Sequence, residues 1–425
     1  MDTRSVTKET GGARRPGILG SLRHRIGQGE LGPLPIVVGM AAIWIYFQLQ
    51  DSNFLSSRNL TFLLLQMTVT GTVATGIVLV LLLGEIDLSA GSVTGLSAAI
   101  LGVLLVQEHQ PLWLAVVVML VVAALIGAAQ GSIAAFVGVP AFVVTLAGML
   151  GWLGMQLWVL GPNGSINVSD PSLTLLFTTY VPPILGWAGG ITLVAAYAGV
   201  RLNANRQRRR LRLSTTPWTK LLVRPSLVAV LVLVSVGILN QWRGVPLAVL
   251  ILLLMVAAID LLLTRTSFGQ HVFAVGGNPE AARRAGINLA AVRVTIFAMC
   301  ALMAGVAGLM TVSRSFAAST QTGGGTLLLE AIAAAVIGGT SLFGGRGSVW
   351  SAPLGALVMA SLANGLDLTG ESAAIKYVVE MIVLLVAVTV DALARRGRQS
   401  RPTLGGPADH STMPVSRACW SLRGA

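Results

Sequence analysis

Charged residues are scarce in this 425-residue chain: Asp, Glu, Lys and Arg together make up 11% of it, whereas hydrophobic residues make up 54%. A soluble protein of this length needs a charged surface, so the composition excludes an ordinary soluble globular protein. The apolar residues also gather in long runs, for example 112–136 and 246–263. A run of about 20 apolar residues is long enough for a helix to cross the hydrocarbon core of a bilayer. The sequence therefore predicts a polytopic membrane protein.

Cysteine, histidine and lysine are also rare, and their rarity excludes several kinds of chemistry. The two cysteines lie in an apolar run (Cys300) and in the polar tail (Cys419), so we expect no structural disulfide. The four histidines are scattered and have no cysteine at zinc-ligand spacing, so we expect no metal site. A phosphate-binding loop ends in Gly-Lys-Ser/Thr, yet none of the three lysines follows a glycine. The chain is therefore not expected to bind or hydrolyse ATP itself, and a membrane-embedded enzyme is disfavoured because no nucleophile or metal set converges.

The net charge of +13 is unevenly distributed along the chain. Basic residues gather in the head (1–30), in a segment at 201–224, around 265–292 and in the tail from 394 onward. Each group flanks apolar runs, as the positive-inside rule requires of cytoplasmic segments. A nucleic-acid partner is the alternative for the cluster at 206–212, but no aromatic residues are interleaved with these arginines to stack on bases. We therefore expect these segments to be cytoplasmic and expect no nucleic-acid partner.

The apolar runs predict an all-α transmembrane bundle of about ten to twelve spans, some of them broken or re-entrant helices. The expected helices are 34–50, 60–83, 90–106, 112–136, 139–160, 183–200, 225–241, 245–263, 292–312, a broken segment at 326–345, 349–366 and 373–392. They form one membrane domain (31–393), which a mobile basic head (1–30) and tail (394–425) flank. Because both ends are basic, both termini are expected to be cytoplasmic, which requires an even number of spans. No signal-peptide cleavage pattern follows the first run, so we expect it to remain as the first helix.

The polar stretch 161–182 has few charges and is expected to face the outside, either as a plain connector or as a contact for an external partner.

The first candidate site is the stretch Gly84-Glu85-Ile86-Asp87-Leu88-Ser89-Ala90-Gly91-Ser92 between two apolar runs. Carboxylates in or near hydrocarbon cost a few kcal/mol and often mark a cavity, a partner or an ion path. The alternative is an interfacial turn whose carboxylates cap the next helix. We retain Glu85, Asp87 and Ser89 as translocation-path candidates.

The second candidate site is a glycine-rich segment, 326–348, which carries an acidic residue, Glu330, within an apolar run near its start. Its small residues let helices approach closely, and its glycines let irregular backbone line a cavity that is shielded from lipid. The path candidates here are Glu330, Gly338, Gly339, Thr340 and Ser341. The stretches 81–93 and 337–349 form a weak internal repeat, because each passes through a Gly/Ser break into Gly-Ser-Val. Breaks at matching places in two halves of a transporter point to its translocation site.

The third candidate site is the loop 265–292. Asn278 followed by Pro279 is a good helix start, and Gly286 is a good stop, so the sequence predicts a capped helix of about two turns. Such a helix between two spans suits docking into a groove on a cytoplasmic partner. The alternative is a connector that lies on the membrane surface.

Taken in order, these segments resemble the permeases of binding-protein-dependent ABC importers for ribose, xylose, arabinose and galactosides. The matching segments are GEIDLSAGS (84–92), VPAFVVTLAGML (139–150), FGQHVFAVGGNPEAARRAGIN (268–288), EAIAAAVIGGTSLFGGRGS (330–348) and LANGLDLTG (362–370). The resemblance is collinear from about residue 50 to 392. It is strongest to the xylose-type permeases, which share the long middle region at 183–245. This sequence departs from the family at Leu328-Leu329-Glu330, where the family often has Glu-Leu-Asp.

The resemblance implies a permease of the bacterial inner membrane that imports a monosaccharide, most simply a pentose such as D-xylose. It implies three partners: a cytoplasmic ATPase subunit that binds the ATP, an extracytoplasmic sugar-binding protein, and a second copy of this chain. By the same resemblance, the residues that couple to the ATPase are Gly276, Gly277, Asn278, Pro279, Glu280, Ala281, Arg283, Gly286 and Asn288. The competing hypothesis is a secondary transporter driven by protons or sodium, with Glu85, Asp87 and Glu330 as the titrating groups.

Overall fold

The computed structural model describes residues 34–211, 214 and 217–399, and nearly all of them that are in regular structure are helical. The predicted head (1–30) and all but the first residues of the predicted tail (394–425) lie outside the described residues. The first half contains α2 (Leu34–Gln50), α3 (Ser57–Leu82), α4 (Ala90–Gly102) with the wider turn η1 (Val103–Gln107), α5 (Leu112–Ser132) with η2 (Ile133–Val137), α6 (Ala141–Leu160) and α7 (Pro171–Thr178). The second half contains α8 (Pro183–Arg210), α9 (Trp218–Asn240), α10 (Leu247–Arg265), α11 (Ser267–Gly277), α12 (Pro279–Arg284), α13 (Leu289–Ser315), α14 (Leu327–Ile337), α15 (Ser351–Leu368) and α16 (Ala373–Gln399).

A helix occupies each of the predicted spans, so the predicted all-α membrane fold is confirmed. Among the described residues, eight helices are long and apolar enough to cross a membrane, and the apolar helices at 36–50 and 327–337 are shorter. The broken segment predicted at 326–345 is α14 followed by an irregular stretch. The exact number of crossings and the side on which the termini lie stay predictions.

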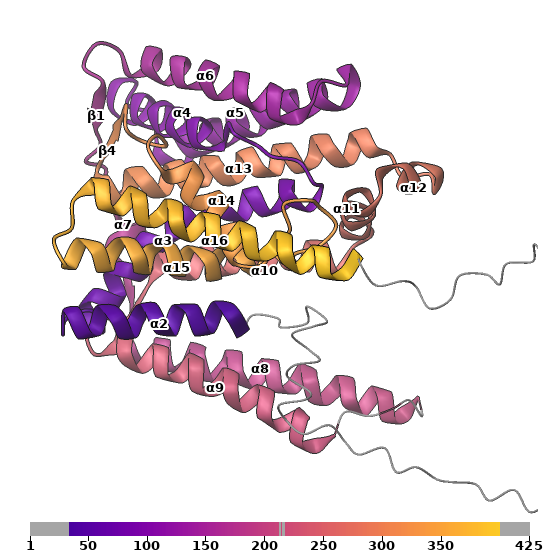
Figure 1. The fold of residues 1–425 in the computed structure, drawn as a ribbon. Coiled ribbons are helices and arrows are strands. Elements are labelled where there is room, and N and C mark those ends of the chain that lie inside the picture. Colours follow the sequence, from indigo (N-terminus) through magenta and orange to yellow (C-terminus); the bar gives the residue numbers. More distant parts are fainter. Residues whose placement is uncertain (1–33, 212–213, 215–216, 400–425) are drawn as a thin grey trace, which may run out of the picture. The chain divides into compact units, whose positions relative to one another are not determined.

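The centre of the bundle is α3, which is buried along most of its length and packs against α13, α14 and α15 (Figure 1). Small residues permit these close contacts. A Cβ on Gly76 would lie 2.9 Å from the carbonyl oxygen of Cys300, and one on Gly127 would lie 2.3 Å from that of Phe297. Backbone contact of this kind between helices is how small residues stabilise bundles in lipid.

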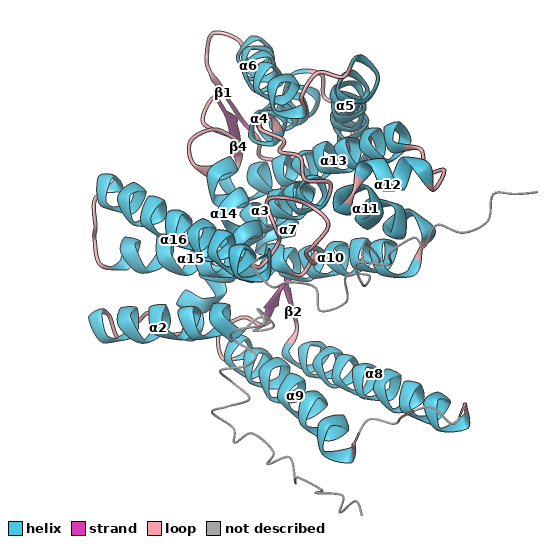
Figure 2. Ribbon diagram, turned by 45° about the vertical axis from the view of Figure 1, so that its right-hand side comes forward, coloured by secondary structure: helices cyan, strands magenta, loops and turns pink. Residues whose placement is uncertain are grey.

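The helices α8 and α9 pack mainly on each other as a hairpin (Figure 2) and expose many large apolar side chains. Exposed leucine and valine on such helices are stable only in a hydrocarbon solvent, which agrees with a membrane location. The prediction of a basic loop over 201–224 is wrong in its extent, because α8 continues to Arg210 and α9 already begins at Trp218. Arginine is a good helix former, and three arginines in the last turn of α8 interact favourably with the negative end of the helix dipole.

The stretch 161–182 is more ordered than a plain polar connector. It contains α7, whose N-cap Asp170 accepts a hydrogen bond from the backbone N–H of Leu173, and it buries Leu173 and Phe177. It also contributes two short antiparallel pairs: β1 (Ser165–Asn167) with β4 (Ala317–Ser319), and β2 (Tyr180–Val181) with β3 (Val245–Pro246). These pairs tie the stretch to the C-terminal end of α13 and to the connection between α9 and α10.

Candidate functional site

The predicted capped helix is present as α12, and a second helix, α11, precedes it. The side chain of Asn278 accepts a hydrogen bond from the backbone N–H of Ala281 at 3.0 Å, and Pro279 occupies the first turn. Gly286 has a φ of +83°, and the N–H of Ile287 returns to the carbonyl oxygen of Ala282 at 3.1 Å. The sequence did not reveal α11, because 268–277 carries no cap as clear as Asn-Pro. Its own N-cap is Thr266, whose hydroxyl accepts from the N–H of Gly269.

The short helix α12 presents an exposed polar face. Of its six residues only Ala282 is buried, while Glu280, Arg283 and Arg284 are exposed. Glu280 and Arg284 form an ion pair of 3.4 Å along the helix. Asn288, at the far end of the segment, caps α13 by accepting from the N–H of Ala291 at 3.0 Å. The helix is thus capped by the side chain of Asn278 at its start and by a backbone hydrogen bond at its end, and its charged face is unobstructed within the described structure.

The two carboxylates of the turn at 83–89, Glu85 and Asp87, have different roles. Glu85 forms an ion pair with Arg293 on α13, with 2.7 Å between Oε1 and Nε, and both side chains are mostly buried. Burial raises the pKa of Glu85, and the charge of Arg293 opposes that rise. Sequence reasoning missed Arg293, because 208 positions separate it from Glu85 and neither residue belongs to a motif that names the other.

Asp87 is fully buried and acts as a local cap. Its Oδ1 accepts hydrogen bonds from the backbone N–H of Ser89 at 2.8 Å and from the hydroxyl of Ser89 at 2.6 Å, immediately before α4 begins. Burial is the main reason that the pKa of Asp87 is raised, and the bonds from Ser89 oppose the shift. The hydroxyl of Ser89 also lies 3.0 Å from Oε1 of Gln130 on α5. These contacts agree with the interpretation of this segment as a capping turn.

An asparagine should replace Asp87 well, because its side-chain carbonyl oxygen can accept the same two hydrogen bonds from Ser89. We expect Asp87→Asn to keep nearly the thermal stability of the wild-type chain in detergent. Asp87→Ala leaves the backbone N–H of Ser89 without its acceptor, which costs about 1–3 kcal/mol and should lower the unfolding temperature clearly. Fluorescence-detected gel filtration after heating measures both variants. An Asp87→Asn protein as unstable as Asp87→Ala would show that the negative charge itself is required.

The glycine-rich segment after α14 forms an irregular stretch that packs on the start of α15. Thr340 is buried, and its hydroxyl lies 2.5 Å from that of Ser351. A Cβ on Gly338 would lie 2.0 Å from the carbonyl oxygen of Ser351, so the chain can pass here only with glycine. The N–H of Ser341 donates to the carbonyl oxygen of Arg346 at 3.1 Å, and Gly339 has a φ of +102°.

Three segments that are far apart in the sequence meet at the ends of α3, α11 and α14. The N–H of Gly345 donates to the carbonyl oxygen of Leu82 at 2.9 Å. A Cβ on Gly276 would lie 1.8 Å from that same oxygen, and a Cβ on Gly344 would lie 2.7 Å from the backbone nitrogen of Gly84. We call Leu82, Gly84, Gly276, Gly344 and Gly345 the glycine junction. It joins the two breaks that form the predicted internal repeat directly to the helix that precedes α12.

The translocation-path candidates therefore fall into two groups. Glu85, Asp87 and Ser89 lie in the turn at the glycine junction, and Gly338, Gly339, Thr340 and Ser341 lie in the irregular stretch next to it. Glu330 lies in the first turn of α14, at the opposite end of an 11-residue helix. At about 1.5 Å of rise per residue, that places it roughly 12 Å along the helix axis from Gly338. The structure does not bring the three acidic residues Glu85, Asp87 and Glu330 together.

The bundle of apolar helices, the matched breaks and the exposed capped helix define a membrane transport permease. Residues 59–388 match the family described as "Branched-chain amino acid transport system / permease component", which covers most of the chain. The chain belongs to this family, and it is a multi-pass protein of the inner membrane.

Curated relatives align with most of this chain and with most of their own length. The chain is 38% identical to the xylose transport system permease protein XylH of Escherichia coli K12 over 85% of this chain and 92% of the relative. It is 37% identical to the XylH protein of Haemophilus influenzae over 84% and 95%, respectively. It is also 32% identical to the ribose import permease protein RbsC of Escherichia coli K12 over 80% and 87%. No solved structure matches the chain.

Proposed function

We propose that this chain is the membrane-spanning permease of an ATP-driven importer that brings a pentose, most simply D-xylose, into the cell. It works with a separate cytoplasmic ATPase subunit that binds the ATP, an extracytoplasmic sugar-binding protein and a second copy of itself. The observation that carries the proposal is the exposed, doubly capped helix α12, which follows directly from the glycine junction. The names of the relatives, two xylose permeases and a ribose permease, support a pentose as the substrate.

The geometry suggests how a movement of the ATPase reaches the bundle. A force on α12 acts on α11 through Gly277 and Asn278, and Gly276 of α11 abuts the backbone where α3 ends. The same force acts on the start of α13, where Arg293 forms an ion pair with Glu85 of the turn at 83–89. A partner shifts such a transporter between states only through its different affinity for the two states. We therefore expect the ATPase, with ATP bound, to favour one arrangement of the two breaks over the other.

A secondary transporter is less well supported. A proton- or sodium-driven mechanism needs acidic side chains that share one path, yet Glu85 is ion-paired, Asp87 caps a turn and Glu330 lies at the far end of α14. Uptake into vesicles that contain the purified chain distinguishes the two functions. Import that requires ATP, an ATPase subunit and a binding protein supports the proposal, whereas import driven by an ion gradient with this chain alone contradicts it.

The coupling role of α12 can be tested by Gly286→Pro. Proline cannot adopt the φ of +83° found at Gly286, so the end of α12 must rearrange at a cost of about 1–3 kcal/mol. We expect ATP-driven uptake to fall about tenfold while the chain still inserts, and Glu280→Ala to reduce co-purification with the ATPase subunit. Gly161→Pro is the control, because Gly161 also has a positive φ, +69°, but follows α6, away from α12. Uptake that is unchanged in both Gly286→Pro and Glu280→Ala would remove the docking role.

A further inference from the structure

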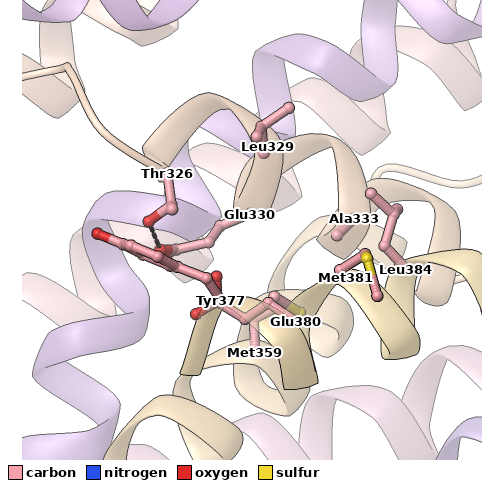
Figure 3. Close-up of a pocket in the computed structure, with 9 residues that line it drawn as sticks. All are labelled: Thr326, Leu329, Glu330, Ala333, Met359, Tyr377, Glu380, Met381 and Leu384. Atoms are coloured by element: carbon pink, nitrogen blue, oxygen red, sulfur yellow. Dashed lines mark hydrogen bonds between the residues drawn. The ribbon is translucent and has the colours of Figure 1, made fainter. Parts of the chain in front are cut away.

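A cavity of about 280 Å³ lies between the first turns of α14 and the helices α15 and α16 (Figure 3). Ligand pockets for drug-sized molecules are typically about 300–1,000 Å³, so this volume suits a smaller solute such as a monosaccharide. Its walls combine apolar side chains, among them Met359 and Leu384, with a few polar groups.

Two carboxylates face the cavity from different helices. Glu330 of α14 is held in place by the hydroxyl of Thr326 on its own helix and by that of Thr70 on α3, which donates at 3.3 Å. Glu380 of α16 is half-buried and makes no hydrogen bond or ion pair with another described residue. One carboxylate is therefore oriented by the protein, and the other has its hydrogen-bonding capacity free.

An aromatic ring completes the wall. Tyr377 lies three residues before Glu380 on α16, so both side chains share one face of that helix (Figure 3). Carboxyl oxygens accept hydrogen bonds, and each hydroxyl of a sugar can donate one. The flat ring of tyrosine offers an apolar surface and a polar tip, which suits the C–H face and the hydroxyl rim of a pyranose.

We propose that Glu330, Tyr377 and Glu380, with Thr326, form a subsite for a polyhydroxylated sugar on its route through the permease. This inference rests on the proposed function, because it takes the sugar to be the transported substrate. The subsite gives Glu330 a role in binding the sugar, whereas the carboxylates of the turn at 83–89 take no part in it. It also brings in Tyr377 and Glu380, which sequence reasoning did not identify. Sequence reasoning missed them because they lie in a helix with no glycine break, and only the fold places them opposite Glu330.

Protection of an introduced thiol tests the subsite directly. Met381 lines the cavity, whereas the next residue, Ile382, is turned about 100° around α16 and is similarly exposed, at 49% against 57%. In a chain that carries Cys419→Ser, we compare the alkylation rates of the thiols introduced by Met381→Cys and by Ile382→Cys, with D-xylose as the probe. We expect xylose at concentrations well above its dissociation constant to slow alkylation at position 381 about twofold or more, and to leave position 382 unchanged.

The second arm removes the polar groups. Glu380→Gln, Glu330→Gln and Tyr377→Ala should each abolish the protection at position 381, whereas Glu371→Gln, on the turn before α16, should not. Equal protection at positions 381 and 382, or protection that survives all three substitutions, overturns the subsite. So does slow alkylation at position 381 without sugar, because it means that a second copy of the chain covers the cavity. Xylose import that depends on ATP and the binding protein, but without protection at position 381, overturns the subsite and leaves the proposed function intact.

Discussion

Replacing Gly276 with alanine should abolish most ATP-driven sugar uptake, although the change adds a single methyl group. Gly276 has an ordinary backbone conformation that alanine also adopts, so the substitution causes no torsional strain. The new Cβ would instead lie 1.8 Å from the carbonyl oxygen of Leu82 and 2.8 Å from the backbone nitrogen of Gly345. Both neighbours are backbone atoms and cannot turn aside. Since overpacking costs about 1–3 kcal/mol, we expect α11 to shift and uptake to fall about tenfold or more.

The adjacent glycine provides a matched control. A Cβ on Gly277 would have no atom within 4 Å, so Gly277→Ala makes the same chemical change next to the junction without a clash. Uptake into vesicles with the ATPase and the binding protein, normalised to the amount of inserted chain, measures both variants. We expect Gly277→Ala to transport like the wild type. Similar losses in the two variants would mean that flexibility between α11 and α12, and not close backbone contact, is what transport needs.

The fold was largely predictable because each membrane helix is marked by an apolar run within one continuous stretch of sequence. Apolar runs located most of the spans to within a few residues. Asn278, Pro279 and Gly286 located α12, because capping depends only on neighbours in the chain. The errors arose where hydrophobicity was a poor guide. Polar arginine-rich sequence continued α8 beyond the expected end, and the eight-residue α7 lay in a polar connecting stretch whose apolar run is too short for a membrane span.

The arrangement of the site was less predictable, because it depends on contacts between distant segments. The internal repeat showed that breaks occur at 81–93 and 337–349, but nothing in a list of glycines indicates which backbone each one touches. Gly344 and Gly345 contact Gly84 and the end of α3 across some 260 positions, and these contacts involve no side chain that a motif could specify. The pairing of Glu85 with Arg293 is of the same kind.

Two structural connections thus join α12 to the turn at 83–89, and they differ in chemistry. The glycine junction is a steric contact that transmits displacement of α11. The pair of Glu85 and Arg293 is an electrostatic contact that ties the start of α13 to the same turn. Because α13 packs along both α3 and α5, movement of its N-terminal end affects the whole bundle. The charges of an ion pair can be swapped between its two positions without losing the attraction, whereas a steric contact cannot be swapped in this way. Charge reversal therefore distinguishes the electrostatic contact from the steric one.

We expect Arg293→Glu and Glu85→Arg each to reduce uptake about tenfold, and the double substitution to restore most of it. Each single change places two like charges at a site where the side chains are only 14% and 30% exposed. Exposed ion pairs contribute about 0–1 kcal/mol, and breaking a fully buried pair costs about 3–5 kcal/mol, so this partly buried pair should fall between. The exchanged pair re-forms the attraction in the same place. A double-mutant cycle on uptake and on the unfolding temperature measures the coupling between the two positions.

The exposed pair on α12 supplies the control for stability. Glu280 and Arg284 are 61% and 79% exposed, so Arg284→Glu should leave the unfolding temperature of the isolated chain close to that of the wild type. Any effect of that substitution on uptake would then arise at the surface of α12 and not within the bundle. If the exchanged Glu85 and Arg293 variant is no better than either single variant, the two residues act independently. The tie between α13 and the turn would then depend on the shapes of the side chains and not on their charges.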